Sequence, residues 1–223
     1  MRSRVAAGPA GEGARERAPM SPGSPRAGRV WAVTDSAAGP ATRRAAGGWG
    51  YASAAWSGLF AVRGVYWALG GTVGLSTLAP TIQDAAVEGD PLLYALLWTT
   101  VALEIVGVLL GLALARGRVP ALRGRDLTDW LLLPAFGAAA MLAGHGALFI
   151  VWGLTSKPSE QVPADTLAWY GRFWGPWFLL GGLLFLAPAV VHLRRRRGRR
   201  AAALASALGA AGGLLVAAAA AVS

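Results

Sequence analysis

The chain contains no cysteine and only one lysine among its 223 residues. The absence of cysteine excludes disulfide bonds, thiolate metal ligands, cysteine nucleophiles and a lipid-modified cysteine anchor. Charged residues are also scarce, at 14% of the chain, whereas a soluble domain carries about 25%. Hydrophobic residues make up 55%. This balance predicts a protein whose solvent is largely lipid rather than water.

The 21 basic residues, 20 of them arginine, give the chain a formal net charge of +10. They are concentrated in three segments, at residues 2–44, 116–125 and 194–200. Because long apolar segments separate these groups, we expect them to contact anionic lipid headgroups on the cytoplasmic side rather than nucleic acid. The use of arginine in place of lysine, with abundant alanine and glycine, is typical of a GC-rich bacterial genome.

Five segments are long and apolar enough to cross a bilayer, which takes about 20 residues per helix. They cover residues 52–78, 92–115, 128–154, 168–192 and 201–222. The last consists mostly of alanine and glycine, which gain little free energy from insertion. The sequence therefore predicts an all-α polytopic membrane helix bundle, with four antiparallel transmembrane helices and a fifth, Ala/Gly-rich C-terminal helix.

Loop charges predict how the chain is threaded, because short loops rich in arginine stay in the cytoplasm. The first loop between spans carries acids and no cation, whereas the second and fourth loops are basic. We expect a multi-pass protein of the bacterial inner membrane with a cytoplasmic N-terminus and, if the fifth helix spans, an external C-terminus. The expected divisions are a disordered basic tail (1–46), a four-helix transmembrane domain (47–193), a basic cytoplasmic loop (194–200) and a C-terminal transmembrane helix (201–223).

Three ionisable side chains, Arg63, Glu104 and His145, lie at or near the middle of the predicted spans. Charges inside a membrane are costly and usually face the bundle interior, where they pair or form part of a pathway. A short loop joins the first two spans, so we expect Arg63 and Glu104 to lie at similar depth and to form a salt bridge. The sequence leaves open whether that pair only locks two helices together or binds a substrate or proton, and it leaves the role of His145 open too.

Glycines follow both charged residues at helical spacing, so each charge would share a helix face with a groove. Small residues four positions apart let two helix backbones approach closely in a membrane. The predicted packing motif comprises Tyr66, Trp67, Gly70, Gly71 and Gly74 on the first span and Gly107 and Gly111 on the second. We expect this motif to hold the two helices together.

Residues 66–75, Tyr-Trp-Ala-Leu-Gly-Gly-Thr-Val-Gly-Leu, resemble the hallmark of a family of small bacterial membrane proteins known as domain of unknown function 3995. A second resemblance lies at residues 173–177, Phe-Trp-Gly-Pro-Trp, where Trp177 departs from the family's usual leucine. The family often has a histidine shortly before the Tyr-Trp pair, whereas this chain has Arg63 in that region. The resemblance covers residues 55–192 and implies a membrane location and fold, without an established activity.

Catalytic signatures are missing from the sequence, which has no zinc-protease motif, serine-hydrolase elbow or phosphate-binding loop. We therefore expect no catalytic residue, no metal site and no cofactor. At the outer interface, Arg172 and Trp174 are candidates for contact with a lipid headgroup, although a snorkelling anchor is the simpler role for Arg172.

These features favour a non-enzymatic accessory or structural membrane protein, which binds a membrane-protein partner or forms a homo-oligomer. The first alternative is a small proton- or ion-coupled transporter that uses the Glu104/Arg63 pair. The second is a lipid-modifying enzyme with its site at the outer interface. A carrier would need Glu104 for substrate binding, whereas an enzyme would depend on outer-face residues such as Arg172.

Overall fold

Helices supply all the regular secondary structure of the residues that the structure describes. The computed structural model describes residues 40–117, 129–195 and 199–219, with side chains from residue 47 onward. Most of the predicted tail at 1–46 lies outside these residues, as do parts of both basic loops. The predicted all-α fold class is confirmed.

Among the described residues, four helices are long and apolar enough to cross a membrane. They are α3 (Pro91–Arg116), α4 (Leu132–Thr155), the continuous helix Ala164–Arg195 and α7 (Arg200–Ala219). The continuous helix begins as α5 (Ala164–Trp169), passes through a π-helical turn, η2 (Tyr170–Trp174), and ends as α6 (Gly175–Arg195). These four helices indicate a multi-pass membrane protein, and they include the predicted Ala/Gly-rich C-terminal helix.

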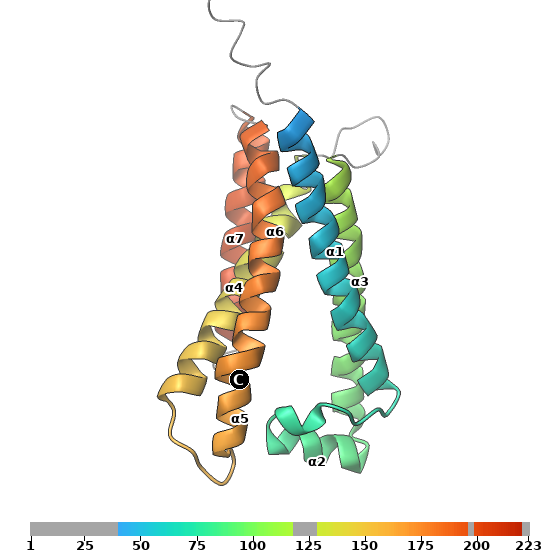
Figure 1. Ribbon diagram of the computed structural model, residues 1–223, viewed down its shortest axis with the longest axis vertical. Coiled ribbons are helices and arrows are strands. Elements are labelled where there is room, and N and C mark those ends of the chain that lie inside the picture. The colour runs from blue at the N-terminus through green and yellow to red at the C-terminus, as the bar shows by residue number, and fades with distance from the viewer. Residues whose placement is uncertain (1–39, 118–128, 196–198, 220–223) are drawn as a thin grey trace, which may run out of the picture. The chain divides into compact units, whose positions relative to one another are not determined.

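The first helix, α1 (Pro40–Ala68), differs from the predicted first span at both ends. It begins before residue 52 and ends at Ala68, so residues 69–78 are not part of it. It is not among the four candidate spans, because glycine, serine, aromatic residues and Arg63 make it less apolar than α3. It nevertheless lies alongside α3 and packs on it extensively (Figure 1).

Helix α1 ends in a glycine turn. Gly70 has a φ of 87°, a left-handed conformation that side-chain-bearing residues rarely adopt. The amide of Gly71 donates to the carbonyl of Tyr66 and that of Gly70 to the carbonyl of Trp67, each over 2.9 Å. This pair of hydrogen bonds closes a helix through a left-handed residue. The structure thus corrects the expectation that Gly70, Gly71 and Gly74 form a helical packing groove, because all three lie beyond the end of α1.

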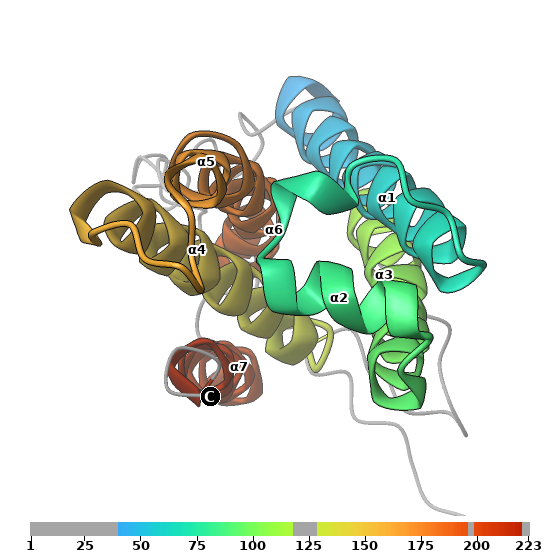
Figure 2. The same cartoon turned by 90° about the horizontal axis from the view of Figure 1, so that it is seen from below.

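After the turn, the chain forms a short 3-10 helix, η1 (Leu75–Thr77), and then α2 (Pro80–Glu88). Helix α2 lies across one end of the bundle, beneath the space between α1 and α3 on one side and α4 and α6 on the other (Figure 2). Asp90 then caps α3 by accepting a hydrogen bond from the amide of Leu92 over 2.8 Å. Helix α2 therefore covers the end of the bundle without crossing it.

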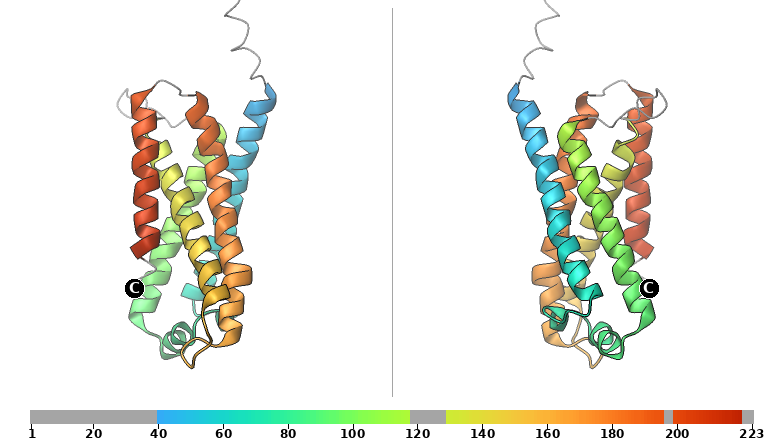
Figure 3. Two further views of the ribbon diagram at one scale, coloured as in Figure 1. Left: turned by 90° about the vertical axis from the view of Figure 1, so that its left-hand side faces the viewer. Right: turned by 90° about the vertical axis from the view of Figure 1, so that its right-hand side faces the viewer.

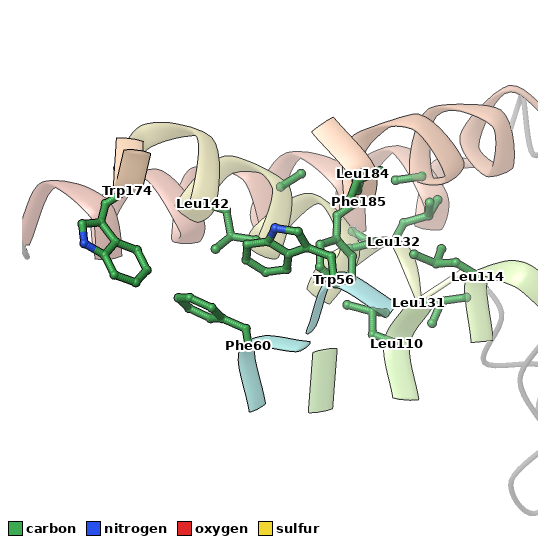
Figure 4. Packing of buried hydrophobic residues seen from close by; sticks show 14 of the residues in the cluster. Trp56, Phe60, Leu110, Leu114, Leu131, Leu132, Leu142, Trp174, Leu184 and Phe185 are labelled. Atoms are coloured by element: carbon green, nitrogen blue, oxygen red, sulfur yellow. The ribbon is translucent and has the colours of Figure 1, made fainter. Parts of the chain in front are cut away.

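The long helices form two groups. Helix α1 packs on α3, while α4 packs on both α6 and α7, and α6 joins the groups through its contacts with α1 (Figure 3). At this junction the Ser53 hydroxyl donates to the carbonyl of Leu184 over 2.7 Å. Trp56 stacks on Phe60 with ring centroids 5.3 Å apart, and both rings belong to the buried cluster shown in Figure 4. Contacts of α3 with α4 are few.

Close backbone contacts hold α1 against α3. A Cβ atom placed on Gly111 would lie 2.6 Å from the amide nitrogen of Ala54, and one on Gly107 would lie 2.7 Å from the Ser57 Oγ. Real side chains do not fit at such distances, so the contact depends on glycine. Gly107 and Gly111 therefore lie where the sequence placed them, in the groove of α3, but their partner on α1 is the stretch 50–57.

Helix α4 uses glycine against both of its neighbours. A Cβ atom on Gly137 would lie 3.4 Å from the carbonyl oxygen of Gly209 in α7, whereas one on Gly146 would lie 2.6 Å from that of Gly175 in α6. An ion pair between Arg199 Nε and Asp129 Oδ2, 3.0 Å apart, joins residues just before α7 and α4. The alanine-rich helix α7 is thus held by direct backbone approach rather than by large side chains.

The helix ends that adjoin the basic segments lie together. The C-terminal ends of α3 and α6 and the N-terminal end of α7 are at one end of the bundle, and α2 is at the opposite end (Figure 1). Arg116 and Arg195 close α3 and α6, whereas Asp84 and Glu88 belong to α2. The two ends therefore differ in charge in the way that the loop pattern predicted, while the orientation in a membrane stays a prediction.

Candidate functional site: a cavity between the helix groups

A cavity of about 430 Å³ lies between the two helix groups, with Ile82 of α2 and Leu78 in its wall. Pockets that bind small molecules commonly enclose about 300–1,000 Å³ and often lie between the helices of a bundle. Most of the wall is apolar, and its phenylalanine, tyrosine and tryptophan members are Trp56, Phe60, Trp67, Phe149, Tyr170, Trp174, Phe178 and Phe185. The cavity is therefore large enough for a small molecule and is suited to an apolar one.

All three ionisable residues singled out in the spans line this cavity. Arg63 comes from α1, Glu104 from α3 and His145 from α4. Helices α1 and α3 form one group and α4 belongs to the other, so tertiary packing alone brings the histidine to the pair. The structure thus places the predicted polar residues in one site.

The Arg63 guanidinium lies among aromatic rings. Its central carbon is 3.6 Å from the ring centroid of Phe60, 4.3 Å from that of Trp67 and 5.1 Å from that of Trp174. A guanidinium within about 6 Å of a ring face is attracted by the negative charge density of that face, by about 2 kcal/mol when desolvated. We call Phe60, Trp67 and Trp174 the aromatic cage; it fixes the position of Arg63.

The expected salt bridge between Arg63 and Glu104 is present as a single long contact. Arg63 Nη2 lies 3.8 Å from Glu104 Oε1, beyond hydrogen-bond distance. Arg63 Nε and Glu104 Oε2 are buried and have no hydrogen-bond partner among the described residues. Buried polar atoms normally find partners, because leaving one without a hydrogen bond costs about 1–3 kcal/mol. The pair is close enough for charge compensation, but its hydrogen-bonding capacity is not used.

His145 is surrounded by aromatic side chains. Its ring centroid lies 4.2 Å from that of Phe149 and 5.0 Å from that of Phe178, the second contact being edge-on. The structure gives it no hydrogen bond to the described residues. His145 therefore adds a further polar group to the cavity, one that the protein positions by ring packing alone.

The loop that follows α1 holds two members of the aromatic cage. The Trp67 indole Nε1 donates to the carbonyl of Val73 over 2.9 Å, and that of Trp174 donates to Thr77 Oγ1 over 3.2 Å. Thr77 Oγ1 in turn donates to the carbonyl of Gly74 over 2.6 Å. Because Gly74 has a φ of 84°, the chain can fold back to place these acceptors. The segment 66–77 thus orients the cage instead of packing two helices.

The π-helical turn η2 supplies Tyr170 and Trp174 to the cavity wall. Single π-helical turns occur frequently at functional sites. Trp174 is buried, whereas Arg172 is exposed and lies beside a separate pocket that includes Gly153 and Gly171. Trp174 is therefore closed to the expected contact with a lipid headgroup, because side chains two positions apart on a helix point in different directions, whereas that contact stays a prediction for Arg172.

The cavity is partly open at its side. Leu103 of α3 and Val216 of α7 are wall residues that are 62% and 58% exposed. Both belong to candidate membrane spans, and contacts between α3 and α4 are sparse. An opening rimmed by exposed aliphatic side chains on transmembrane helices faces the lipid. The cavity can therefore be reached from the hydrocarbon region of the bilayer.

A second cavity, of about 130 Å³, lies at the ends of α3 and α6. Arg116, His192 and Arg195 are among its wall residues, together with Gly47 of α1. It joins basic side chains from two helices at the end of the bundle opposite α2. Its polar character separates it from the larger cavity, whose wall is mainly apolar.

Fold and site together define a multi-pass helical membrane protein with a central cavity that combines an aromatic cage with an Arg–Glu pair. The chain matches the family described as "Protein of unknown function (DUF3995)" over residues 57–185. It belongs to that family, as the resemblance at residues 66–75 indicated. Arg63, Glu104 and His145 all fall within the matched region, whereas α7 lies outside it. No curated protein and no solved structure matches the chain.

Several wall residues were not predicted as site residues. Phe60 precedes Arg63 by one helical turn, so helical spacing could have placed its ring beside the guanidinium, and Trp67 was predicted only as part of the packing motif. Tyr170 and Phe149 come from elements distant in sequence, and no local signal connects them to the site.

Proposed function

We propose that this DUF3995 protein binds an amphipathic small molecule, taken from the surrounding lipid, in the cavity around Arg63 and Glu104. The observation that carries the proposal is a charged pair without a hydrogen bond in the wall of a largely apolar cavity, where Arg63 Nη2 and Glu104 Oε1 lie 3.8 Å apart. A ligand with an apolar body and a polar head would complete these contacts. Binding of this kind is a non-enzymatic role, and it is compatible with an accessory protein that presents the ligand to a membrane partner.

A purely structural role for the Arg63–Glu104 pair fits the geometry less well. An arginine that serves to lock two helices is expected to meet a carboxylate through two parallel hydrogen bonds of about 2.7–2.9 Å. The observed contact is single and 3.8 Å long. Helices α1 and α3 are already held by the close approach at Gly107 and Gly111. The charged pair is thus left available for another partner.

Filling the cavity tests this proposal. Ala138→Phe places a ring in the wall, whereas Ala147→Phe adds the same ring at an exposed position of the same helix. We would purify the wild type and both variants in mild detergent and identify co-purifying molecules by mass spectrometry of organic extracts. We expect an amphipathic molecule with the wild type and Ala147→Phe, and its loss from Ala138→Phe. Equal recovery from all three proteins would contradict the proposal.

A proton- or ion-coupled carrier is the second candidate, and the position of Glu104 favours it. A carboxylate inside a membrane bundle, in a cavity open to lipid, is a typical feature of substrate and proton pathways. Glu104→Gln would then abolish coupled uptake into proteoliposomes, because a carrier needs this carboxylate to bind its substrate. A binding protein that is not a carrier would give no uptake in either form.

Location and lipid partners are part of the same proposal. Basic side chains of Arg116, His192 and Arg195 around the smaller cavity support contact with anionic headgroups at that end of the bundle. The loop charges support a cytoplasmic position for this end, in a bacterial inner membrane.

A further inference from the structure

We infer that the cavity selects an amphiphile with an uncharged headgroup that both donates and accepts hydrogen bonds, such as a hydroxyl or carboxamide. This inference rests on the proposed function and specifies its ligand class. It follows from the charge balance around the Arg63–Glu104 pair and from the way the aromatic cage is filled.

The charges of the cavity compensate one another. A guanidinium remains protonated in proteins, and Glu104 Oε1 lies 3.8 Å from it. The other titratable wall residues are His145 from α4 and Tyr170 from η2. A ligand charge of either sign would add an uncompensated charge to an apolar cavity, which is strongly unfavourable. An uncharged ligand leaves the balance intact.

The aromatic cage does not favour a cationic ligand, because Arg63 already occupies it. Aromatic rings bind ammonium groups well when their faces are free. Here the Arg63 guanidinium lies within 5.1 Å of all three ring centroids. A cation would have to displace Arg63, and an anion drawn to Arg63 would meet the carboxylate of Glu104.

The length of the contact between Arg63 and Glu104 suits a headgroup that both donates and accepts hydrogen bonds. At 3.8 Å the two side chains attract each other but do not form a hydrogen bond. A hydroxyl or amide placed beside them can donate to the carboxylate and accept from the guanidinium at once. Hydrogen bonds to charged groups are stronger than those between neutral groups, by roughly a factor of two. The alkyl part of the ligand would extend toward the lipid-facing rim at Leu103 and Val216.

Three matched compounds test this inference on the full chain in phosphatidylcholine nanodiscs. Each has the same bromododecyl chain and ends in a primary alcohol, a carboxylate or a trimethylammonium group. Bromine quenches tryptophan fluorescence at short range, and Trp56, Trp67 and Trp174 line the cavity. Binding in the cavity is measured as the saturable component of the quenching. This component should be retained in Ala147→Phe and lost in Ala138→Phe. We expect the alcohol to bind about tenfold more tightly than either charged compound.

Charge variants sharpen the test. Glu104→Gln leaves Arg63 uncompensated, so the preference should move to the carboxylate compound; Arg63→Gln leaves Glu104 uncompensated, so it should move to the trimethylammonium compound. The matched controls are Glu88→Gln and Arg172→Gln, which make the same changes at exposed positions and should keep the preference for the alcohol. If a charge variant fails to fold, as judged by its thermal transition, the ranking of the three compounds in the wild type still decides.

The outcomes separate the inference from the proposed function. If none of the three compounds shows saturable quenching that Ala138→Phe removes, the proposed function itself fails. If a charged compound binds the wild type more tightly than the alcohol does, the proposed function stands and the uncharged-headgroup inference is overturned. Tightest binding of the alcohol, with the expected shifts in the two charge variants, supports both.

Discussion

Arg63 is held more by aromatic rings than by its carboxylate partner. The three rings of the aromatic cage lie 3.6–5.1 Å from its guanidinium carbon, whereas the contact with Glu104 exceeds hydrogen-bond length. A desolvated cation–π contact contributes about 2 kcal/mol. The carboxylate therefore compensates the charge of Arg63 while the rings determine where the guanidinium sits.

A double-mutant cycle on Arg63→Met and Glu104→Gln tests whether the carboxylate contributes little to holding Arg63 in place. Breaking a buried, hydrogen-bonded ion pair costs about 3–5 kcal/mol. Because this contact is single and long, we expect the coupling energy between the two changes to be below about 2 kcal/mol. Equilibrium unfolding in detergent provides the measurement, with Arg172→Met as the exposed control. A coupling energy of 3 kcal/mol or more, on the scale of about 3–5 kcal/mol for buried pairs, would identify the pair as a structural lock.

At the scale of elements, α7 is attached through glycine. A Cβ atom on Gly213 would lie 2.9 Å from the amide nitrogen of Met141, while one on Gly212 would meet nothing within 4 Å. Gly213 thus lies against the α4 backbone, whereas its neighbour Gly212 faces open space. Since α7 contributes Val216 and Ala217 to the cavity wall, its attachment also shapes the site.

The absence of cysteine allows a clean test of how α7 docks. A Cβ atom on Gly144 would lie 3.0 Å from the Cβ of Ala217, so a small outward shift brings the two to the Cβ–Cβ distance of a disulfide, about 3.5–4.5 Å. Gly144→Cys with Ala217→Cys should therefore crosslink under mild oxidation. Adding Gly213→Leu should reduce crosslinking severalfold because the new side chain meets the α4 backbone. Adding Gly212→Leu should leave it unchanged. The measurement is the mobility shift on denaturing gels, and equal crosslinking in both backgrounds would disprove the docking contact.

At the scale of the whole bundle, charge differs between the two ends. Arg116 and Arg195 close helices at one end, while the acids of α2 lie at the other. A membrane protein keeps its arginine-rich ends in the cytoplasm. The end covered by α2 should therefore face outward.

Cysteine labelling in intact cells tests this orientation. Glu88→Cys, on the exposed part of α2, should react with a membrane-impermeant maleimide. Arg116→Cys should react only after the cells are permeabilised, because its end of the bundle should face the cytoplasm. The opposite labelling pattern would show that the bundle is inverted.

The local sequence pattern was enough to predict most of the helices and the polar residues of the candidate site. Long apolar runs identified α3, α4, α6 and α7, and the rarity of charge inside such runs singled out Arg63, Glu104 and His145. The end of α1 was misplaced because glycines at helical spacing were read as a groove. Gly70 is instead the left-handed residue that ends the helix, and glycine is common at that position. The mainly apolar composition of residues 69–78 concealed this break.

The amino-acid sequence by itself determined that this protein is a helical membrane protein, because hydropathy and charge are properties of composition and position along the chain. It also determined which few side chains are costly to bury. Only the tertiary structure decided that Trp174 completes the aromatic cage around Arg63, and that Arg63, Glu104 and His145 line one open cavity. These arrangements depend on contacts between residues far apart in sequence. The local sequence pattern is compatible with many ways of packing the helices together, and the fit of side chains and backbones selects one of them.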